Sequence, residues 1–280
     1  MSWQLPIAAV QMRSVGDLAG NLSVVRELVG RAAAGGAKLI VLPECFSFLG
    51  RAEGDKFAAA EVLDDHPAGA RGPVMQTLAE LATKHGAWII GGGTPETVPG
   101  DPKRTYNALV VVDPSGTLVA KYRKIHLFDV DIPGGATLRE SDATAAGDEA
   151  IVADIAGVKV GLSICYDLRF PELYRTLVKD RGAEVVVIPA AFTAHTGAAH
   201  WHVLMRARAI EGQVWIVAAA QWGKHNDRRE SYGHSLVVDP WGTIVGELAE
   251  GDGVVAAMLD GETVAKRRAQ MPVLRHAVLW

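Results

Sequence analysis

The chain has 280 residues, of which 49% are hydrophobic, enough for one or two domains with a substantial buried core. Its 28 lysine and arginine residues against 32 aspartate and glutamate residues give a formal net charge of −4, which provides no broad cationic field for nucleic acid or an anionic membrane. We find no charged leader before an apolar segment and no bilayer-spanning apolar run, so we expect a cytoplasmic protein with no membrane or nucleic-acid partner.

The only two cysteines, Cys45 and Cys165, lie far apart in the sequence and form no CxxC pair. Their number and spacing argue against a disulfide scaffold and against a zinc site, so we expect no metal. A reduced thiol that could act as a nucleophile remains open.

Short apolar strands alternate with helical segments from end to end, which is typical of a layered α/β domain. In the first half, strands are expected at 5–11, 38–43, 87–91, 106–112 and 118–123, with the last two joined by a turn at 113–116. One helix is expected to begin at an Asn21 cap and to end at Gly35, and a second to cover 74–85 and to end at Gly86.

The second half repeats this alternation. Strands are expected at 151–155, 158–164, 184–188, 214–220 and 254–259, with a hairpin through a turn at 239–242 and helices at 171–179 and 200–211. A charged helix and an apolar tail follow the last strand, and no low-complexity linker divides the chain.

Two stretches of the first half have counterparts in the second half. Residues 36–44 resemble residues 182–190, and residues 109–119 resemble residues 236–245 across their Asp-Pro-X-Gly-Thr turns. These matches, in the same order, predict two similar halves packed sheet against sheet with helices outside. The correspondence breaks at the strand end, where Glu44 is matched by alanine, which points to chemistry at Glu44, with a solvated strand-end carboxylate as the alternative.

Cys165 lies between an apolar strand and Pro171, which suits the first turn of a helix. A sulfur at such an elbow lies near free backbone N–H groups, including that of Tyr166, which can lower the pKa of the thiol and bind a developing oxyanion. A buried structural cysteine is the alternative, because cysteine is among the most often buried residues. Cys45 follows Glu44 and should point the opposite way in an extended chain, so we interpret it as a packing residue.

A nucleophilic cysteine needs a base. Nine histidines make a Cys-His pair the first candidate, but no histidine is distinguished by its position. Glu44 is the other candidate, because burial at a strand end raises the pKa of a carboxyl group toward that of a useful general base.

Lys124 lies just beyond a strand end, in the segment 121–126, where lysine, arginine or histidine occupies four of the six positions. Tyr122 and Ile125 are interleaved with these charges, a pattern that predicts a half-buried segment. A semi-buried lysine can stabilise negative charge on a substrate oxygen. A solvated charged surface is the alternative.

Three separated segments resemble the carbon–nitrogen hydrolases of the nitrilase superfamily, and the resemblance covers nearly the whole chain. Residues 42–44, Leu-Pro-Glu, are similar to the strand end with the family's glutamate base. Residues 122–126, Tyr-Arg-Lys-Ile-His, are similar to its lysine segment, and residues 163–172 to its cysteine elbow.

The resemblance implies a catalytic triad of Glu44, Lys124 and Cys165 that needs no cofactor. It also implies that Glu140, which is similar to the second glutamate of the amidase branches, holds the lysine and shapes the pocket. The substrate contacts implied are Tyr166, Phe192 and Thr196.

The implied fold is an α/β four-layer α-β-β-α sandwich with internal pseudo-two-fold symmetry, in agreement with the internal repeat. A single carbon–nitrogen hydrolase domain is expected over residues 1–260. The helix and tail at 261–280 are expected to form a subunit contact in a homodimer or a larger even homo-oligomer.

Within the superfamily, four segments most resemble the deaminated glutathione amidase branch: residues 196–201, 206–211, 218–221 and 231–235. The ω-amidase branch, with α-ketoglutaramate or α-ketosuccinamate as substrates, comes close. Both branches imply hydrolysis of the amide of a small anionic acid through a cysteine thioester. Trp222 and the run 227–230 follow no ligand pattern.

Other functions are weighed against this one. A nucleotide-binding module is suggested by three glycines at 91–93, although neither GxGxxG nor a lysine followed by serine or threonine accompanies them. A catalytically silent assembly protein would leave Glu44, Lys124 and Cys165 far apart. Nitrile hydrolysis, or another amidase activity of the superfamily, would use the same three residues.

Overall fold

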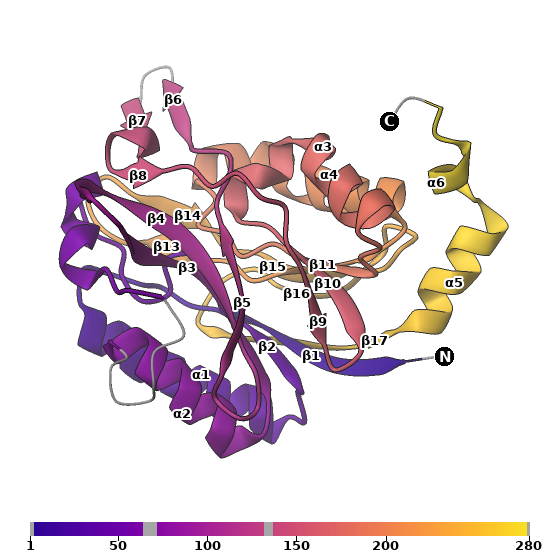
Figure 1. The fold of residues 1–280 in the computed structure, drawn as a ribbon, viewed down its shortest axis with the longest axis horizontal. Helices are drawn as coiled ribbons and strands as arrows, with labels where there is room; N and C mark the ends of the chain where they lie inside the picture. Colours follow the sequence, from indigo (N-terminus) through magenta and orange to yellow (C-terminus); the bar gives the residue numbers. More distant parts are fainter. Residues whose placement is uncertain (1–2, 64–71, 132–136, 279–280) are drawn as a thin grey trace.

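Two mixed β-sheets pack face to face, and helices cover their outer faces (Figure 1). The computed structural model describes residues 3–63, 72–131 and 137–278. The expected α/β four-layer sandwich is confirmed. Within the described residues, no helix combines the length and apolar character needed to cross a bilayer.

The first sheet has the order β17-β1-β2-β3-β4-β5, with β8 paired to β4. Its central strands β1, β2 and β3 are parallel, and the other strands of this order join them antiparallel. The bounds are β1 (Gln4–Gln11), β2 (Leu39–Val41), β3 (Trp88–Val98), β4 (Asp101–Val112), β5 (Leu118–Arg123), β8 (Thr144–Ala145) and β17 (Gly253–Asp260), with helices α1 (Leu18–Ala34) and α2 (Pro73–His85) on the outer face.

The second sheet has the order β16-β15-β12-β11-β10-β9. Its bounds are β9 (Val152–Ile155), β10 (Val158–Leu162), β11 (Val185–Val187), β12 (Trp215–Ala218), β15 (Ser235–Val238) and β16 (Ile244–Leu248). The helices on its outer face are α3 (Pro171–Arg175), which continues as a π-helical turn at Thr176–Asp180, and α4 (Ala194–Gly212).

The two sheets share one topology, which confirms the predicted internal pseudo-symmetry. The strands β17-β1-β2-β3-β4-β5 correspond to β9-β10-β11-β12-β15-β16, with three parallel strands in the centre of each sheet. The first pair of matched segments contains β2 and β11, and the second contains the hairpins β4-β5 and β15-β16.

Alternation along the strands divides the core in two. On β1, Leu5, Ile7 and Ala9 belong to the cluster that fills the space between the sheets and extends to α3 and α4. Ala8 and Val10 point the other way, into the cluster beneath α1 and α2. Because both faces of the central strands are buried, they read as continuous apolar runs.

Two helices begin earlier than the sequence predicts. Helix α1 begins at Leu18 because Asp17, not Asn21, is its N-cap and accepts a hydrogen bond from the Gly20 N–H at 3.1 Å. Asn21 instead lies inside the helix, where its buried amide group bonds the Val15 and Ser47 carbonyl oxygens. Helix α4 begins at residue 194 rather than 200, since its first turn faces a cavity and carries no apolar periodicity.

The three glycines at 91–93 lie within β3 and lead into more strand, not into a helix. The nucleotide-binding interpretation is therefore wrong. A Cβ atom on Gly92 would lie 2.1 Å from the Cβ of Pro189, so this glycine allows the two halves to approach closely.

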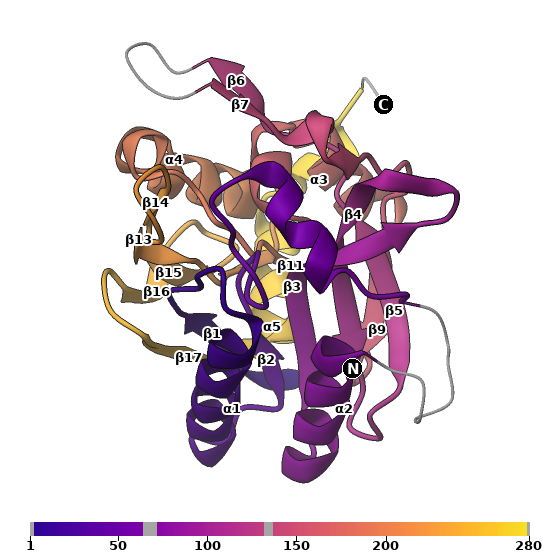
Figure 2. The ribbon, with the colours of Figure 1, turned by 90° about the vertical axis from the view of Figure 1, so that its left-hand side faces the viewer.

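Two small ribbons that the sequence did not predict lie outside the large sheets (Figure 2). They are formed by β6 (Asp129–Asp131) with β7 (Thr137–Arg139), and by β13 (Trp222–Lys224) with β14 (Glu230–Tyr232). Three 3₁₀ helices, at Glu53–Ala59, Glu140–Asp142 and Cys165–Arg169, complete the surroundings of the site.

The C-terminal segment, in yellow in Figure 1, forms α5 (Gly261–Gln270) and the short α6 (Val273–His276) along one side of the sandwich. The apolar tail, expected to contribute to a subunit contact, is covered in part by its own chain. Leu274 packs against the core of its own chain, whereas Val278 is 92% exposed. Leu279 and Trp280, which the same expectation included, lie outside the described residues.

Candidate active site

The chain segments that follow β2, β5 and β10 meet around one cavity of about 340 Å³. Glu44 follows β2, Lys124 follows β5 and Cys165 follows β10, and all three line this cavity together with Glu140. Glu44 and Cys165 lie beyond the carboxyl ends of the parallel strands β2 and β10, which is where open α/β sheets bind their ligands. The structure thus brings together the four residues that the sequence singles out.

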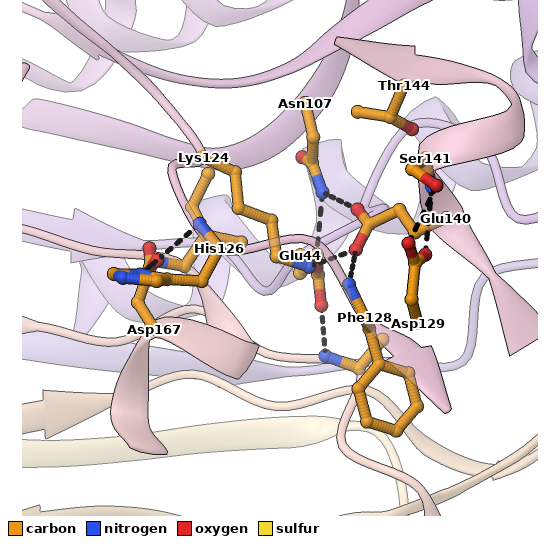
Figure 3. Close-up of polar contacts among 12 residues, drawn as sticks. Glu44, Asn107, Lys124, His126, Phe128, Asp129, Glu140, Ser141, Thr144 and Asp167 are labelled. Atoms are coloured by element: carbon orange, nitrogen blue, oxygen red, sulfur yellow. Dashed lines mark hydrogen bonds and ion pairs between the residues drawn. The ribbon is translucent and has the colours of Figure 1, made fainter. Parts of the chain in front are cut away.

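Lys124 is the centre of a buried ion-pair network (Figure 3). Its Nζ atom lies 3.1 Å from Glu44 Oε1 and 2.8 Å from Glu140 Oε2, and its side chain is 2% exposed. Burial alone would lower the pKa of Lys124, but the Glu140 and Glu44 carboxylates raise it well above its ordinary value. Burial likewise would raise the pKa of Glu140, and the Lys124 charge reverses this and lowers it. The lysine therefore remains cationic in a nearly dry site.

Asn107, which the sequence analysis missed, joins the two carboxylates of this network. Its Nδ2 atom donates to Glu44 Oε1 at 2.9 Å and to Glu140 Oε1 at 3.3 Å. The other Glu44 oxygen accepts the Ala191 N–H at 2.8 Å. Gly93, with a φ of +84°, leaves the room required, since a Cβ there would lie 2.7 Å from Asn107 Oδ1. Glu44 is held from several directions.

Cys165 occupies the predicted elbow between a strand and a helical turn. It begins a 3₁₀ helix after β10, and its φ of 46° lies in the left-handed region, where few residues with a Cβ are found. Its N–H donates to the Pro189 carbonyl oxygen at 2.9 Å. A tight, strained turn of this kind fixes the position of a side chain at the end of a sheet, and here the buried Cys165 lines the cavity.

The surroundings of the Cys165 thiol oppose its ionisation. Burial raises the pKa of the thiol well above its ordinary value and the Glu44 carboxylate raises it further, while the Lys124 charge and the Ala191 N–H act in the opposite direction. The free thiol is therefore protonated near neutral pH, and a reaction that uses its sulfur needs a base nearby.

Cys45 does not point away from the site, and our interpretation of it as a packing residue was wrong in this respect. The chain turns at Cys45, whose φ is 58°, and Cys45 is one of the residues that line the same cavity. The prediction failed because it assumed an extended chain beyond Glu44. Burial and the Glu44 carboxylate raise the pKa of the Cys45 thiol to about 12.

Asp167 ties the lysine segment to the cysteine elbow. Its buried carboxylate accepts hydrogen bonds from the Tyr122 hydroxyl at 2.6 Å and from the Ile164 N–H at 2.8 Å. It also lies 2.7 Å from His126 Nδ1, and the His126 ring stacks on Phe170 with centroids 3.7 Å apart. The carboxylate therefore bonds residues on both sides of Lys124 and the residue before Cys165.

Among the described residues, the histidines that line the cavity are His195 and His225. Both ring nitrogens of His225 are already bonded, Nδ1 to the Ser14 carbonyl oxygen and Nε2 to the Ser231 hydroxyl, each at 2.8 Å. The side chains that act most strongly on the Cys165 thiol are Glu44 and Lys124. The geometry favours the glutamate over a Cys-His pair.

The three residues expected near the substrate, Tyr166, Phe192 and Thr196, all line the cavity. Tyr166 and Phe128 form an edge-on aromatic pair with centroids 4.9 Å apart. The Thr196 hydroxyl is 2.7 Å from that of Thr193. Apolar walls with a few polar atoms are typical of sites for small molecules.

The run 227–230, which followed no pattern in the sequence, forms part of the cavity rim. Asp227 pairs with Arg51 at 2.6 Å, and Arg229 pairs with Glu53, so ion pairs connect this loop across the rim to the start of the 3₁₀ helix and to the segment just before it. Arg228 also lines the cavity. Trp222 is not part of the lining, and its indole N–H donates to Asp252.

Two arginines of the cavity, Arg169 and Arg228, form no ion pair within the described part of the chain. Arg169 lies over the rings of Phe192 and Tyr166, with its guanidinium carbon 4.9 and 5.8 Å from their centroids, and it contacts His200. Arg228 is exposed at the rim. The cavity therefore presents two cations whose charge is not balanced by a carboxylate of the described protein.

Comparison with known proteins agrees with this geometry. Residues 6–269 match the carbon–nitrogen hydrolase family. The chain belongs to this family. It is therefore an enzyme that hydrolyses carbon–nitrogen bonds other than peptide bonds. The interpretation as a silent assembly protein is wrong.

This carbon–nitrogen hydrolase is 43% identical over 278 residues to a protein of Bos taurus named deaminated glutathione amidase, with 98% of this chain and 82% of the relative covered. It is 42% identical over 274 residues to a protein of the same name from Synechocystis, with 97% of each covered. The crystal structure of Saccharomyces cerevisiae Nit3, described as a member of branch 10 of the nitrilase superfamily, superposes with a TM-score of 0.86 at 34% identity, over 96% of this chain and 95% of that chain. The hydrolase is therefore an amidase of the nitrilase superfamily.

Proposed function

We propose that this amidase hydrolyses the amide of a small anionic acid through a thioester on Cys165. In this proposal Glu44 is the general base, Lys124 stabilises the oxyanion, and Glu140 holds the lysine in place. The observation that carries the proposal is the contact of the Lys124 ammonium with Glu44 at 3.1 Å, on the same cavity wall as the Cys165 thiol.

The reaction needs Glu44 as a proton carrier because the free thiol is protonated. Glu44 takes the thiol proton as the sulfur bonds to the amide carbonyl carbon, and passes it to the nitrogen as the C–N bond breaks. Glu44 then takes a proton from water as that water attacks the thioester. The proton returns to sulfur when the C–S bond breaks, and the carboxylic acid leaves.

Two donors would bind the oxygen that becomes negative during both attacks. Lys124 Nζ is one, and its two carboxylate partners hold it in place. The Tyr166 N–H is the other, because it belongs to the first turn of a 3₁₀ helix, where backbone N–H groups lack an intrahelical partner. Each such donor typically contributes about 3 kcal/mol.

For the substrate we propose deaminated glutathione. Relatives 43% and 42% identical to this chain carry the name deaminated glutathione amidase. Deaminated glutathione has a carboxylate on each side of the amide that is broken, one on the 2-oxo acid and one on the departing dipeptide. The unpaired Arg169 and Arg228 provide two matching cations. α-Ketoglutaramate, the second candidate, shares the 2-oxo acid but releases only ammonia.

Kinetics with the purified protein test this proposal. We expect kcat/KM to fall in the order deaminated glutathione, α-ketoglutaramate, asparagine, with a neutral aliphatic amide and an N-carbamoyl amino acid lower still. A higher kcat/KM for the neutral amide or the carbamoyl compound would exclude an anionic substrate while leaving the thioester mechanism intact.

A matched pair of variants tests whether Arg228 binds the carboxylate of the departing dipeptide. Arg228→Ala should lower kcat/KM for deaminated glutathione about tenfold or more, because a charge-assisted hydrogen bond is lost. It should leave α-ketoglutaramate turnover nearly unchanged, since that substrate has no carboxylate in its leaving group. The control is Lys224→Ala, which removes an exposed cation of the same segment outside the cavity. Equal effects on both substrates would contradict this role of Arg228.

The remaining proposals concern the whole particle. We propose that residues 1–260 act as one hydrolase domain and that residues 261–280 contribute to a homodimer or a larger even assembly. The exposure of Val278, at 92%, supports a partner surface at the tail.

Because the mechanism needs Cys165 as a reduced thiol, we propose the cytoplasm as the compartment of action.

A further inference from the structure

Three metal-ligating side chains converge on the edge of the second sheet, outside the cavity. They are His202 on α4, His234 just before β15, and Glu247 on β16. Their ligand atoms all lie within 4.8 Å of one another. The Glu247 Oε1 atom is 2.8 Å from His202 Nε2 and 2.5 Å from His234 Nδ1. Two imidazole nitrogens therefore face one carboxylate oxygen.

The surroundings hold these rings in place. The His234 ring stacks on Tyr232 with centroids 4.2 Å apart, and the His234 carbonyl oxygen accepts the Trp201 indole N–H at 2.9 Å. The rings of His202 and His234 are inclined at 77°, with centroids 5.0 Å apart, so they do not stack and can approach one ion from different sides. His234 also has a φ of 57°, a conformation that costs energy and is kept only where the surroundings impose it.

Charge and access favour a cation at this position. The three side chains are 23–32% exposed, which leaves an open side for solvent. No lysine or arginine of the described chain forms an ion pair with Glu247.

We propose that His202, His234 and Glu247 form a binding site for Zn²⁺ or a similar divalent transition metal. Two imidazole nitrogens and one carboxylate oxygen are ligands typical of zinc, and a water would complete a tetrahedral site. In its hydrogen bond to Glu247, each facing ring nitrogen carries a proton. When the cation binds, that proton moves to the other nitrogen of the ring or to solvent, and the freed nitrogen lone pair bonds to the cation. Mg²⁺ and Ca²⁺ are disfavoured because two of the three ligands are nitrogen.

The ion would join α4 to the sheet edge next to the cavity wall. Helix α4 begins with cavity residues and reaches His202 two turns later. Tyr232, which supports His234, donates its N–H to the carbonyl oxygen of the cavity residue Phe192 at 2.9 Å. Because the ion binds only the folded arrangement of three elements, it should raise the melting temperature of the protein.

The test uses the full-length protein after chelator treatment and dialysis, with Zn²⁺ or Co²⁺ as the only addition. Calorimetry should show one Zn²⁺ per chain, also in Cys165→Ser, which removes the active-site thiol as a ligand. Co²⁺ should give the intense visible absorption of a tetrahedral site without a thiolate band. Zn²⁺ should also raise the melting temperature.

Variants identify the side chains that bind the ion. The double variant His202→Ala/His234→Ala should lose binding and the shift in melting temperature, and Glu247→Gln, which keeps the shape of the side chain, should weaken binding about tenfold or more. His200→Ala, an exposed histidine on the same helix, should bind as the unchanged protein does. Circular dichroism confirms folding. The absence of binding in Cys165→Ser, or unchanged binding in the double variant or in Glu247→Gln, would overturn the proposal.

Discussion

The charge of Glu44 has opposite effects on two steps of the proposed reaction. The Glu44 carboxylate raises the pKa of the Cys165 thiol and so disfavours the free thiolate. As a general base, the same carboxylate takes the thiol proton while the sulfur attacks the substrate. Lys124 touches the same carboxylate at 3.1 Å and would remain beside Cys165 if the Glu44 charge were removed. Substitution of Glu44 should therefore separate the ionisation of the thiol from catalysis.

We expect Glu44→Gln to lower the rate of amide turnover by roughly 100-fold or more, because glutamine cannot take the proton from the thiol. The same variant should be alkylated by iodoacetamide faster at pH 8, since removal of the negative charge lowers the pKa of the Cys165 thiol and increases the thiolate fraction. Mass spectrometry of the labelled peptides gives both the rate and the position.

Cys45 must be followed separately in this experiment. In the unchanged protein its thiol pKa of about 12 should keep it unlabelled at pH 8, but the Glu44 carboxylate contributes to that pKa, so the labelled peptides of Glu44→Gln must distinguish Cys45 from Cys165. Cys45→Ala should retain turnover whereas Cys165→Ala should not. Faster turnover in Glu44→Gln than in His195→Ala would favour a Cys-His mechanism instead.

At the scale of single residues, the sequence identified the charged side chains but not those that orient them. Glu44 was visible because its counterpart in the second half is alanine, and Cys165 because it precedes a helix start. Asn107 carried no such signal, since it is one polar residue in a predicted strand. Its partners are Glu44, which follows β2, and Glu140 in the 3₁₀ helix at 140–142, both far away in sequence.

At the scale of elements, Asp167 connects the β5 end to the cysteine elbow. We expect Asp167→Asn to lower kcat about 100-fold with little change in KM, because Lys124 and Cys165 would shift relative to each other. The variant should also lose about 1–3 kcal/mol in the free energy of unfolding, since an amide cannot replace a carboxylate that accepts from several donors.

Steady-state kinetics and urea denaturation measure the two effects. Asp113→Asn, in an exposed turn where the aspartate also accepts several hydrogen bonds, is the matched control and should keep kcat. If Asp167→Asn changed stability but not kcat, Asp167 would have no role in positioning.

The strand and helix content was largely predictable, because buried strands and amphipathic helices leave periodic patterns. The β6-β7 and β13-β14 ribbons were not, since they are short and carry no apolar alternation. Likewise, the early start of α4 could not be found from periodicity, because its first residues serve the cavity rather than the core.

At the scale of the whole molecule, the tail provides the test of assembly. Deletion of the residues after Pro272 should lower the particle mass or cause aggregation on light scattering, because apolar contacts with a neighbouring subunit are lost. The milder Val278→Ser should weaken association on dilution. Val119→Ser, at a residue 46% exposed on the β4-β5 hairpin, is the control and should leave the mass unchanged.

The oligomeric state of the intact chain must be measured alongside that of the deletion variant. A protein that is monomeric before deletion and remains so afterwards would contradict the proposed assembly. The duplicated topology was predictable from two short repeats, whereas no pattern within one chain reveals which surface a second copy covers.

The pairing of β17 with β1 bears on how the polypeptide is made. All eight residues of β1 are matched by β17, from Gln4 opposite Asp260 to Gln11 opposite Gly253. During synthesis, therefore, the outer edge of the first strand stays open until more than nine-tenths of the chain exists. An open strand edge invites pairing with other chains, so nascent molecules need protection from aggregation for almost the whole of translation. The two halves resemble each other, yet the sheet of the first half is completed only by a strand from the end of the chain.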